Sequence, residues 1–373
     1  MKTSFFIRIL VCVLLFFSII SCENKIKSTI IHENKISRHG HTEIYGNNKI
    51  IIIAGLTKKL PINSIEIFNI EKNIFEKNIS LQFLKRGWHR TSKLQKDFFL
   101  ISGGWTNGNL ALRESVIVEM PSFQIKTKSD LNIGRYDHTS TPISGTKILI
   151  TGGNDGKKAL RSMEIFDFKK SKFTMSKQPM YLKRQQHTAT LLKNNNILIL
   201  GGTSDNKTSY AEIYELKQSR TKLVKTPLNN PRSRHTSTLL IDGRVLITGG
   251  LGPKRTLNTA ETFNPKEKNV TLLKNRMAES RQQHTSTLLP DGRVAIIGGW
   301  GGVGKTLDSV EIFYPTLNCF KKFGFLSQPR RFHSASLIGN NRILVVGGAS
   351  DDKVHSNSET ISLGEKKKKI SCN

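Results

Sequence analysis

Apolar and polar positions alternate in a fixed order that is clearest in the C-terminal third of the chain. His284–Leu289 alternates small polar and apolar side chains, which suits a strand in crowded surroundings. Turn residues at 290–292 then predict a hairpin into Arg293–Ile297, a nearly continuous apolar run that indicates burial on both faces. Further strands are predicted at Ser309–Tyr314 and, with a more polar pattern, near Cys319–Phe325. This stretch therefore contains four antiparallel strands.

The four-strand pattern recurs along the chain. Paired glycines end the buried run at Gly103-Gly104, Gly152-Gly153, Gly201-Gly202, Gly249-Gly250, Gly298-Gly299 and Gly347-Gly348, with Ala54-Gly55 as a degenerate first copy. From Gly55 onward, the second residues of these pairs are 49, 49, 49, 48, 49 and 49 positions apart. An Arg-x-x-His motif has the same period, with its arginines at Arg38, Arg86, Arg135, Arg184, Arg232, Arg281 and Arg330. Two independent markers in one register predict seven repeats that begin at Arg38.

Seven units of four antiparallel strands predict an all-β protein, a seven-bladed β-propeller. The 29 glycines and the hydrophobic content of 37% agree with many thin strands. The units resemble the kelch repeat in their paired glycines after the second strand, their Glu-x-aromatic third strand and the arginine before the first strand. The segment "HTSTLLPDGRV" in the sixth unit is similar to the repeats of kelch propellers of the galactose-oxidase type. The resemblance extends from Arg38 to the C-terminus.

The closure of the ring has two possible solutions. Either "KKKKISC" (Lys366–Cys372) is the fourth strand of the last blade, or "KIKSTII" (Lys25–Ile31) returns from the N-terminus to complete it. The second solution joins the termini and protects two loose sheet edges. We favour it, because a lysine run is a poor strand former.

The segment "GWGGVGKT" (Gly299–Thr306) matches the phosphate-binding pattern G-x-x-x-x-G-K-[ST]. A phosphate-binding loop must open a helix, whose first N–H groups hold the phosphates. The residues that follow, "LDSVEIFYP", alternate as a strand does, and Thr306 aligns with Thr256 of the preceding repeat. This segment is therefore expected to be a loop between strands and not a nucleotide site.

The N-terminal residues are expected to lie outside the fold. Lys2 and Arg8 precede an apolar run that is too short to span a bilayer, which is typical of a secretory signal. The run ends in Ile-Ile-Ser-Cys, which resembles a bacterial lipobox and implies a lipid on Cys22. The expected division is a signal peptide at 1–21, a lipidated tether at 22–37 that could include the ring-closing strand, and the propeller at 38–373. The expected location is the bacterial cell envelope, and the outer membrane in particular.

The charge balance indicates anionic partners. The 58 Lys and Arg residues against 28 Asp and Glu give a formal charge of +30, and such a field attracts acidic proteins, acidic glycans or lipid headgroups. An alternative is that the lysines reflect an Asn- and Ile-rich composition, although this does not explain the scarcity of acids. No specific nucleic-acid site is indicated, and a monomer is expected.

The motif histidines are expected to be structural. Seven symmetric positions around a channel are too far apart to converge on one metal ion, and no Cys/His metal spacing exists. We expect each histidine to form a hydrogen bond with a neighbouring strand. No metal or cofactor is assigned.

The seven motif arginines have two possible roles. In kelch propellers that recognise acidic peptides, arginines in this connection line the binding face, so the resemblance nominates Arg38, Arg86, Arg135, Arg184, Arg232, Arg281 and Arg330 as ligand contacts. Alternatively, they form ion pairs with the third-strand glutamates, and this reading is slightly favoured. The third-strand glutamates are Glu66, Glu164, Glu212, Glu261, Glu311 and Glu359. The second repeat has Val116 at this position, so Arg86 would then be unpaired.

The loops after the glycine pairs supply further candidates, because loops that vary between blades carry function. Aromatic residues beside basic ones can stack on sugars and hold anions, which nominates Trp105, Trp300, Lys254 and Arg255. Trp88 lies inside a motif and is interpreted as packing. Once the signal is removed and Cys22 is lipidated, Cys319 and Cys372 remain as a possible disulfide.

Three functions follow from these observations. The first is a lipid-anchored binding module that recognises an acidic protein or glycan through a basic loop face. The second is a carbohydrate-active enzyme such as a sugar mutarotase; a copper oxidase is disfavoured because the chain ends with the seventh repeat and its tyrosines do not converge. The third is an envelope protein whose basic surface rests on anionic membrane.

Overall fold

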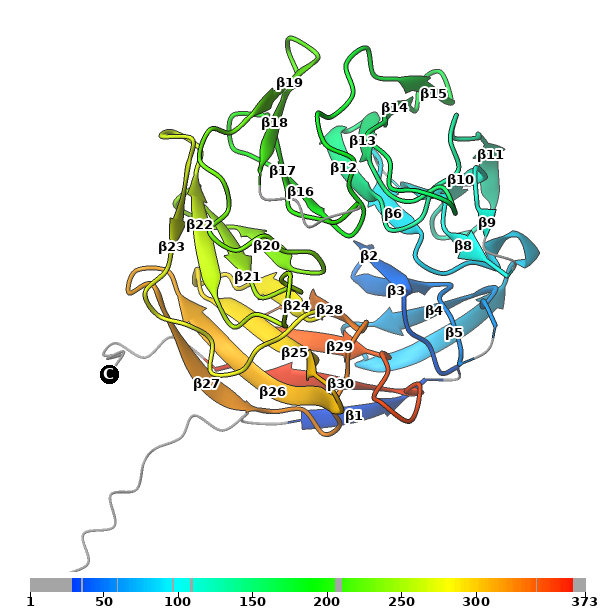
Figure 1. The fold of residues 1–373 in the computed structure, drawn as a ribbon. Coiled ribbons are helices and arrows are strands. Elements are labelled where there is room, and N and C mark those ends of the chain that lie inside the picture. Colours follow the sequence, from blue (N-terminus) through cyan, green and yellow to red (C-terminus); the bar gives the residue numbers. More distant parts are fainter. Residues whose placement is uncertain are drawn as a thin grey trace, which may run out of the picture.

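Seven four-stranded antiparallel sheets are arranged in a ring in the computed structural model (Figure 1), which confirms the prediction of a seven-bladed all-β propeller. The structure describes residues 29–34, 36–58, 60–95, 97–107, 110–204, 210–339 and 341–364. The first strands of adjacent blades contact one another all the way around the ring. They therefore form its innermost layer.

The first three blades follow the chain order. They consist of β2 (Thr42–Gly46), β3 (Lys49–Ile53), β4 (Ser64–Asn69) and β5 (Ile74–Ser80); β6 (Arg90–Lys93), β7 (Phe98–Ser102), β10 (Ser115–Glu119) and β11 (Ile125–Lys128); and β12 (Thr139–Ser144), β13 (Lys147–Thr151), β14 (Met163–Asp167) and β15 (Lys172–Met175). Blade 2 also has a short hairpin in its loop, formed by β8 (Trp105–Thr106) and β9 (Leu110–Ala111). The 3-10 helix η1 (Gln82–Leu84) precedes this blade.

Blades 4 to 6 repeat the same order. They consist of β16 (Thr188–Leu191), β17 (Ile197–Leu200), β18 (Glu212–Glu215) and β19 (Arg220–Leu223); β20 (Thr236–Leu239), β21 (Val245–Thr248), β22 (Ala260–Asn264) and β23 (Asn269–Leu272); and β24 (Thr285–Leu288), β25 (Val294–Gly302), β26 (Lys305–Tyr314) and β27 (Cys319–Phe325).

Blade 7 takes its outer strand from the N-terminus. Its sheet has the order β1 (Thr29–Glu33), β30 (Asn357–Ser362), β29 (Arg342–Val346), β28 (Ser334–Leu337). Thr29 pairs with Ile361 and Glu33 with Asn357, and β1 lies beside β30 in Figure 1. This is the N-terminal closure that the sequence favoured, although the strand runs to Glu33, beyond the expected end. Residues 25–28 and the alternative Lys366–Cys372 segment lie outside the described residues.

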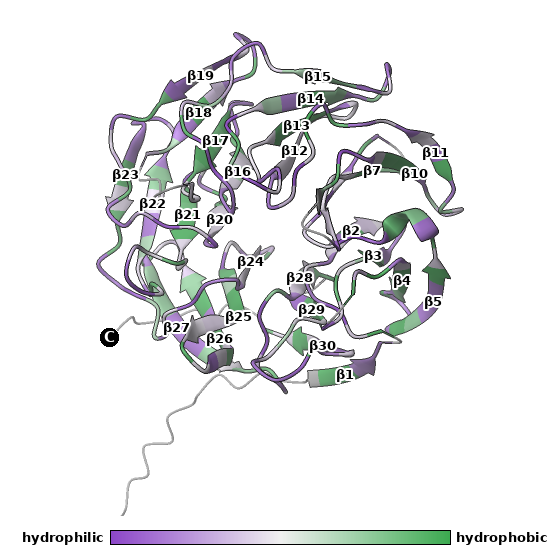
Figure 2. Cartoon of the chain, turned by 45° about the vertical axis from the view of Figure 1, so that its right-hand side comes forward, coloured by the Kyte–Doolittle hydropathy of each residue, from purple (hydrophilic) through white to green (hydrophobic). Residues whose placement is uncertain are grey.

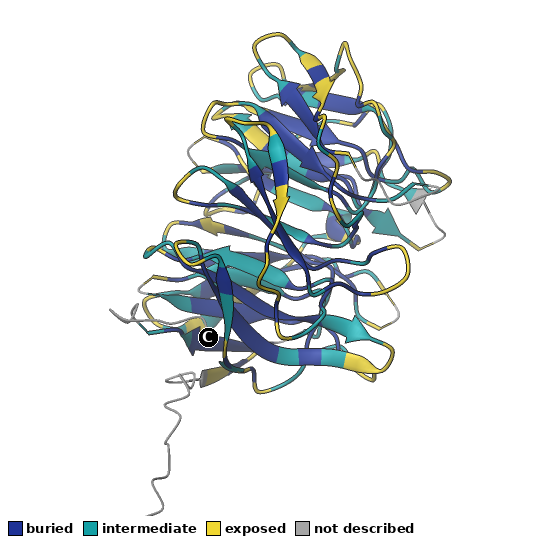
Figure 3. Ribbon diagram, turned by 60° about the vertical axis from the view of Figure 1, so that its left-hand side comes forward, coloured by how far each residue is buried: buried dark blue, intermediate teal, exposed yellow. Residues whose placement is uncertain are grey.

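The core lies between blades, and the second strands supply most of it. In β3, Ile51 and Ile53 pack with Phe99 of blade 2, whereas Ile50 and Ile52 pack toward blade 7. Because successive side chains of a strand point to opposite faces, one apolar run fills two interfaces. Figures 2 and 3 show these strands as hydrophobic and buried, with exposed residues at the turns. Burying each isoleucine contributes about 1.5–3 kcal/mol.

The paired glycines admit the backbone of the next blade. Gly152 and Gly153 have φ of 55° and 96°, values that side chains disfavour. A Cβ added to Gly152 would lie 2.4 Å from the carbonyl oxygen of Arg184. The N–H of Gly153 donates to that same oxygen at 2.9 Å. The glycine pair therefore joins the end of one second strand to the motif of the following blade.

The segment that matches a phosphate-binding loop is a hairpin. β25 and β26 pair beyond the core as far as Gly302 and Lys305, so a strand follows the glycines, as the sequence predicts. Nothing in the described part of the chain gives this loop the helix N-terminus that phosphate binding requires.

The expected signal peptide, the lipidation site Cys22 and most of the expected 22–37 tether lie outside the described residues. Within the described ranges, the structure contains no helix of the length and apolarity needed to cross a membrane.

Candidate functional site

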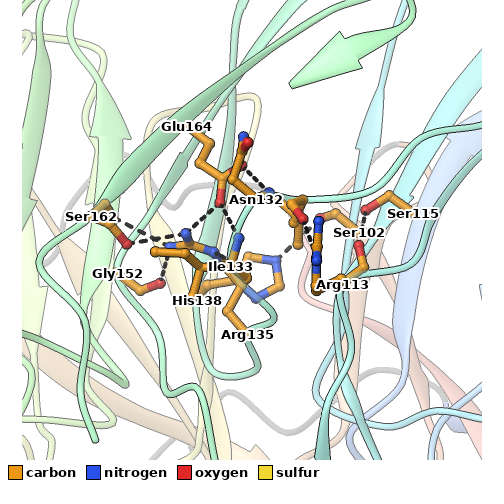
Figure 4. A network of polar contacts seen from close by, with 11 residues as sticks. Ser102, Arg113, Ser115, Asn132, Ile133, Arg135, His138, Gly152, Ser162 and Glu164 are labelled. Carbon is orange, nitrogen blue, oxygen red and sulfur yellow. Dashed lines mark hydrogen bonds and ion pairs between the residues drawn. The ribbon is translucent and has the colours of Figure 1, made fainter. Parts of the chain in front are cut away.

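The first residue of each Arg-x-x-His motif is buried inside its own blade. In Figure 4, Arg135 donates to the carbonyl oxygen of Gly152 at 2.7 Å and to Glu164 Oε1 at 2.6 Å. Its remaining donors reach the Ser162 hydroxyl and carbonyl and the carbonyl of Ile133. All three guanidinium nitrogens are thus used within the protein.

The same ion pair recurs around the ring. Third-strand glutamates pair with six of the arginines at 2.5–2.9 Å, as Arg38–Glu66, Arg135–Glu164, Arg184–Glu212, Arg232–Glu261, Arg281–Glu311 and Arg330–Glu359. The seven arginines are 0–1% exposed. The expectation that they contact a ligand is therefore corrected, because their guanidinium groups have no surface to offer. The alternative reading, an ion pair within the blade, describes the structure.

These pairs also hold the connection between blades. Glu164 Oε2 accepts the backbone N–H of Asn132 at 2.7 Å, and Glu261 Oε2 accepts that of Asn229 at 2.8 Å. Each glutamate therefore fixes the segment that leads into its motif. Charge-assisted bonds of this kind are stronger than neutral ones.

Arg86 is paired, contrary to the sequence expectation. Val116 does occupy the usual glutamate position, but Glu114 Oε1 lies 3.0 Å from Arg86 Nη2. Glu114 is 39% exposed, whereas the other partners are buried. The arginine also donates to the carbonyl oxygens of Phe83, Gly103 and Glu114 at 2.9 Å. A glutamate two residues earlier thus replaces the missing one.

The motif histidines join neighbouring blades, as the sequence predicts. Nε2 forms a hydrogen bond with a threonine or serine hydroxyl of the preceding blade, for example His89 with Thr42 at 2.7 Å and His235 with Thr188 at 3.0 Å. Burial, and secondarily the nearby arginines, lowers the pKa of every motif histidine, to about 3 for His235 and His333. All seven are neutral near pH 7.

The residue before each histidine forms a closed circle, which we call the rim ring. Its members are Gly40, Trp88, Asp137, Gln186, Arg234, Gln283 and Phe332, and their φ values lie between 52° and 58°. Each N–H donates to the carbonyl oxygen of the preceding member at 3.0–3.3 Å, and the N–H of Gly40 closes the circle on Phe332. Non-glycine residues rarely adopt positive φ. Here the conformation is fixed by a circle of seven backbone hydrogen bonds.

The rim ring surrounds a cavity of about 470 Å³ at one end of the channel. One side is aromatic, since Trp88 and Phe332 meet edge to face with ring centroids 4.7 Å apart. The other side is polar: Gln186 Nε2 donates to Asp137 Oδ2 at 2.9 Å, and Arg234 Nε donates to Gln186 Oε1 at 2.9 Å. A symmetric backbone therefore presents an asymmetric set of side chains.

A second hollow adjoins the aromatic side and is called the groove below. It has a volume of about 300 Å³ and is lined by His39, Leu56, Thr57, Lys58, Leu60, Trp88, Trp105 and Tyr136. Trp88 and Tyr136 line both hollows. The cavity and the groove therefore meet at these two side chains.

The loop candidates from the sequence do not converge. Trp105 lies in the groove. Trp300 belongs to blade 6 and lines neither hollow; its indole is 5.6 Å from the guanidinium carbon of Arg331. Lys254 and Arg255 are exposed at a loop tip of blade 5 and line neither hollow. The structure brings only Trp105 to the candidate site.

Sequence reasoning missed the rim ring. From the sequence, Trp88 is expected to be a packing residue, and the expectations from the sequence do not include the other cavity residues Tyr136, Asp137, Gln186, Arg234 and Phe332. A signal was present: the third position of the motif differs in nearly every repeat, while the first and fourth are constant. Variation at one position of a regular repeat is typical of a binding surface.

The described residues contain no group of three or more His, Cys, Asp or Glu side chains that could hold a metal ion. Cys319 is buried and disulfide-bonded, and Cys372, its expected partner, lies outside the described part of the chain.

Comparisons with known proteins agree with the fold. A solved "novel fungal alcohol oxidase with catalytic diversity among the AA5 family, in complex with copper" has a TM-score of 0.72 at 16% identity, over 90% of this chain and 76% of that chain. At this identity the likeness concerns the fold alone. No curated protein matches the sequence. The family described as "KLHDC2/KLHL20/DRC7 Kelch-repeats domain" matches residues 138–348, more than half of the chain. This protein therefore belongs to the kelch-repeat propeller family, whose members generally mediate protein interactions.

Proposed function

We propose that this protein is a recognition module that binds an acidic segment of a partner protein at the rim ring and the groove. The observation that carries the proposal is the rim ring itself, in which seven fixed backbone positions carry dissimilar side chains around a cavity. Preorganised backbone lowers the entropic cost of binding. Aromatic side chains beside arginine are typical of the residues that dominate protein interfaces.

Charge supports an acidic partner. The formal charge is +30, and Lys58, Lys158, Lys254 and Arg255 are exposed on loops at the same end of the propeller. Asp155, on one of these loops, accepts the backbone N–H groups of Lys157 and Lys158 at 2.8 Å and so serves the loop. The exposed cations increase the rate of encounter with an acidic surface.

Anchoring and location complete the proposal. A lipid on Cys22 would hold the propeller at the bacterial envelope, in the outer membrane, because multiple acyl chains bind a bilayer durably. Mass spectrometry of the N-terminal peptide tests the lipid directly. Cys22→Ser should release the protein from the membrane fraction, and density-gradient separation of the two membranes tests the location.

The binding face is tested by photo-crosslinking in cells. A photoreactive phenylalanine replaces Trp88 at the rim ring or Lys266, which is exposed on a turn at the opposite end of the propeller. We expect a discrete adduct from position 88 only, and mass spectrometry would identify the captured protein. Equal adducts from both positions, or adducts with glycan alone, would overturn the proposal.

The acidic character of the partner is tested with the captured protein. Lys158→Glu, Lys254→Glu and Arg255→Glu together should weaken its binding and reduce the salt dependence of the affinity. Unchanged affinity in this variant would mean that the partner is not recognised by charge.

A further inference from the structure

One position of the inner strands breaks the sevenfold pattern. The residue after the motif histidine is a threonine or serine in six blades, namely Thr42, Thr139, Thr188, Thr236, Thr285 and Ser334, but blade 2 has Arg90. In the other blades this hydroxyl lies next to the histidine of the following blade. At the junction of blades 2 and 3, His138 instead forms its hydrogen bond with Ser102 at 3.1 Å. The joint between blades is thus maintained without Arg90.

Arg90 lines the cavity just below the rim ring, together with Asp137, His187 and Thr188. Its Nη1 donates to the carbonyl oxygen of His89 at 3.1 Å. Among the described residues this is the one hydrogen bond of its guanidinium, and Asp137, the carboxylate that acts on its charge, forms no ion pair with it. A guanidinium has five N–H donors, so the other four of Arg90 have no protein acceptor among the described residues, and the side chain lines the cavity. This contrasts with Arg135, whose guanidinium nitrogens are all bonded inside blade 3.

The cavity carries a net positive charge. Arg90 and Arg234 are cations, and Asp137 is the single carboxylate among its lining residues. The histidines that line it, including His187 and His284, are neutral because burial lowers their pKa. Counting these groups leaves one positive charge, which favours a ligand with one negative charge. A dianion would meet Asp137 with no further cation to balance it.

We propose that the channel cavity binds the carboxylate of a small organic acid on the guanidinium fork of Arg90. A planar carboxylate matches that fork with two parallel N–H···O bonds. The aromatic side of the rim ring, Trp88 and Phe332, covers the remainder of the molecule. This site lies inside the channel and does not depend on the partner-protein function proposed above.

The test is a titration of the full chain with benzoate, acetate and glucuronate, with benzyl alcohol and glucose as neutral counterparts. Calorimetry measures affinity, and tryptophan fluorescence reports on the vicinity of Trp88. We expect saturable binding of at least one of the three acids and no saturable binding of benzyl alcohol or glucose. Arg90→Thr, which introduces the residue of the other blades, should weaken that binding at least about tenfold.

Two further variants separate charge from folding. Arg90→Met removes the charge but keeps a long side chain, and should lose binding as Arg90→Thr does. Arg234→Thr removes the second cation and should cause a smaller loss. Equal affinity in wild type, Arg90→Thr and Arg90→Met, or no saturable binding of any of the three acids, would overturn the proposal. Crosslinking of a partner from position 88 should persist in Arg90→Thr, so the two proposals can fail separately.

Discussion

Arg232 and Arg234 are two residues apart in the same four-residue motif, yet they belong to different parts of the molecule. Arg232 is fully buried and pairs with Glu261 at 2.5 Å, as its counterparts pair with the third-strand glutamate in five other blades. Arg234 is partly exposed on the rim ring, where its neighbours are Gln186 and Gln283. The first position builds the blade and is constant, whereas the third position faces the cavity and varies. The role of an arginine here follows from its place in the repeat and not from its chemistry.

The constant positions should fail together in acid, which is the largest effect we expect. Each motif histidine has a folded-state pKa below its unfolded value of about 6.5, so the unfolded state binds more protons as the pH falls. Each therefore costs about 1.4 kcal/mol of stability per pH unit below 6.5. Across seven histidines this rivals the ~5–15 kcal/mol stability of a typical domain. We expect the protein to unfold near pH 5, and near-ultraviolet circular dichroism measures this transition.

A single substitution sharpens this prediction. His284→Gln removes one titrating group but keeps a side chain that can bond Thr236, whose hydroxyl lies 3.0 Å from His284 Nε2. The slope of stability against pH should fall by about 1.4 kcal/mol per pH unit. A native spectrum in wild type at pH 4 would show that the histidines do not control stability.

Substituting Arg232 and Arg234 should have very different effects on stability. Arg232→Ala leaves the buried carboxylate of Glu261 without its cation and should cost about 3–5 kcal/mol. Arg234→Ala removes a partly exposed side chain and should change stability by about 0.5 kcal/mol or less. Urea denaturation of the two variants measures both values. Similar losses in both would mean that the rim ring is structural as well.

The fold could be predicted from the sequence because each blade repeats the same solution. The apolar second strands, the glycine pairs and the motif recur with a period of 48–49 residues, so errors in one blade are corrected by the others. The ion pairs could also be inferred, since Arg135 and Glu164 have counterparts in five other blades, 28 to 30 residues apart in the sequence. The pair of Arg86 and Glu114 could not, because Val116 occupies the strand position of the regular glutamate and Glu114 lies two residues before it.

The candidate site could not be predicted by the same means. Trp88, Asp137 and Arg234 are neighbours only because the ring closes, and their separations in sequence carry no contact signal. Their positive φ could not be predicted from residue type either, because glycine, tryptophan and arginine all adopt it at this position. A consensus of the repeats omits the third motif position because it varies, and in this protein that position lines the cavity.

Glu43 of blade 1 contacts blade 7, and its protonation should affect the stability of this contact. Its carboxylate accepts hydrogen bonds from Ser334 at 2.8 Å and from Ser336, and burial raises its pKa to about 7. A raised carboxylate pKa means that its favourable contribution is complete below about pH 4.5 and is lost as the pH rises through 7. Glu43→Gln should therefore be more stable than wild type at pH 8, by at most about 3 kcal/mol because water screens the partly exposed group.

The matched control for Glu43 lies in the same blade. Glu66→Gln weakens the ion pair with Arg38, whose Nη2 lies 2.9 Å from Glu66 Oε2, and should destabilise the protein at pH 6 and pH 8 alike. Comparing thermal unfolding of the two variants at both pH values separates the effects. A gain from Glu43→Gln that does not grow with pH would contradict the raised pKa.

The smallest effect is expected at the irregular ion pair of blade 2. Glu114→Ala leaves Arg86 with its three carbonyl acceptors, and the partly exposed partner is replaced by water, so the cost should be about 1 kcal/mol or less. Glu164→Ala strands Arg135 in a fully buried site and should cost about 3–5 kcal/mol. Urea denaturation of the two variants gives the ratio. Equal losses would mean that solvent does not reach Arg86, and that this blade is as closed as the six whose glutamates occupy the regular position.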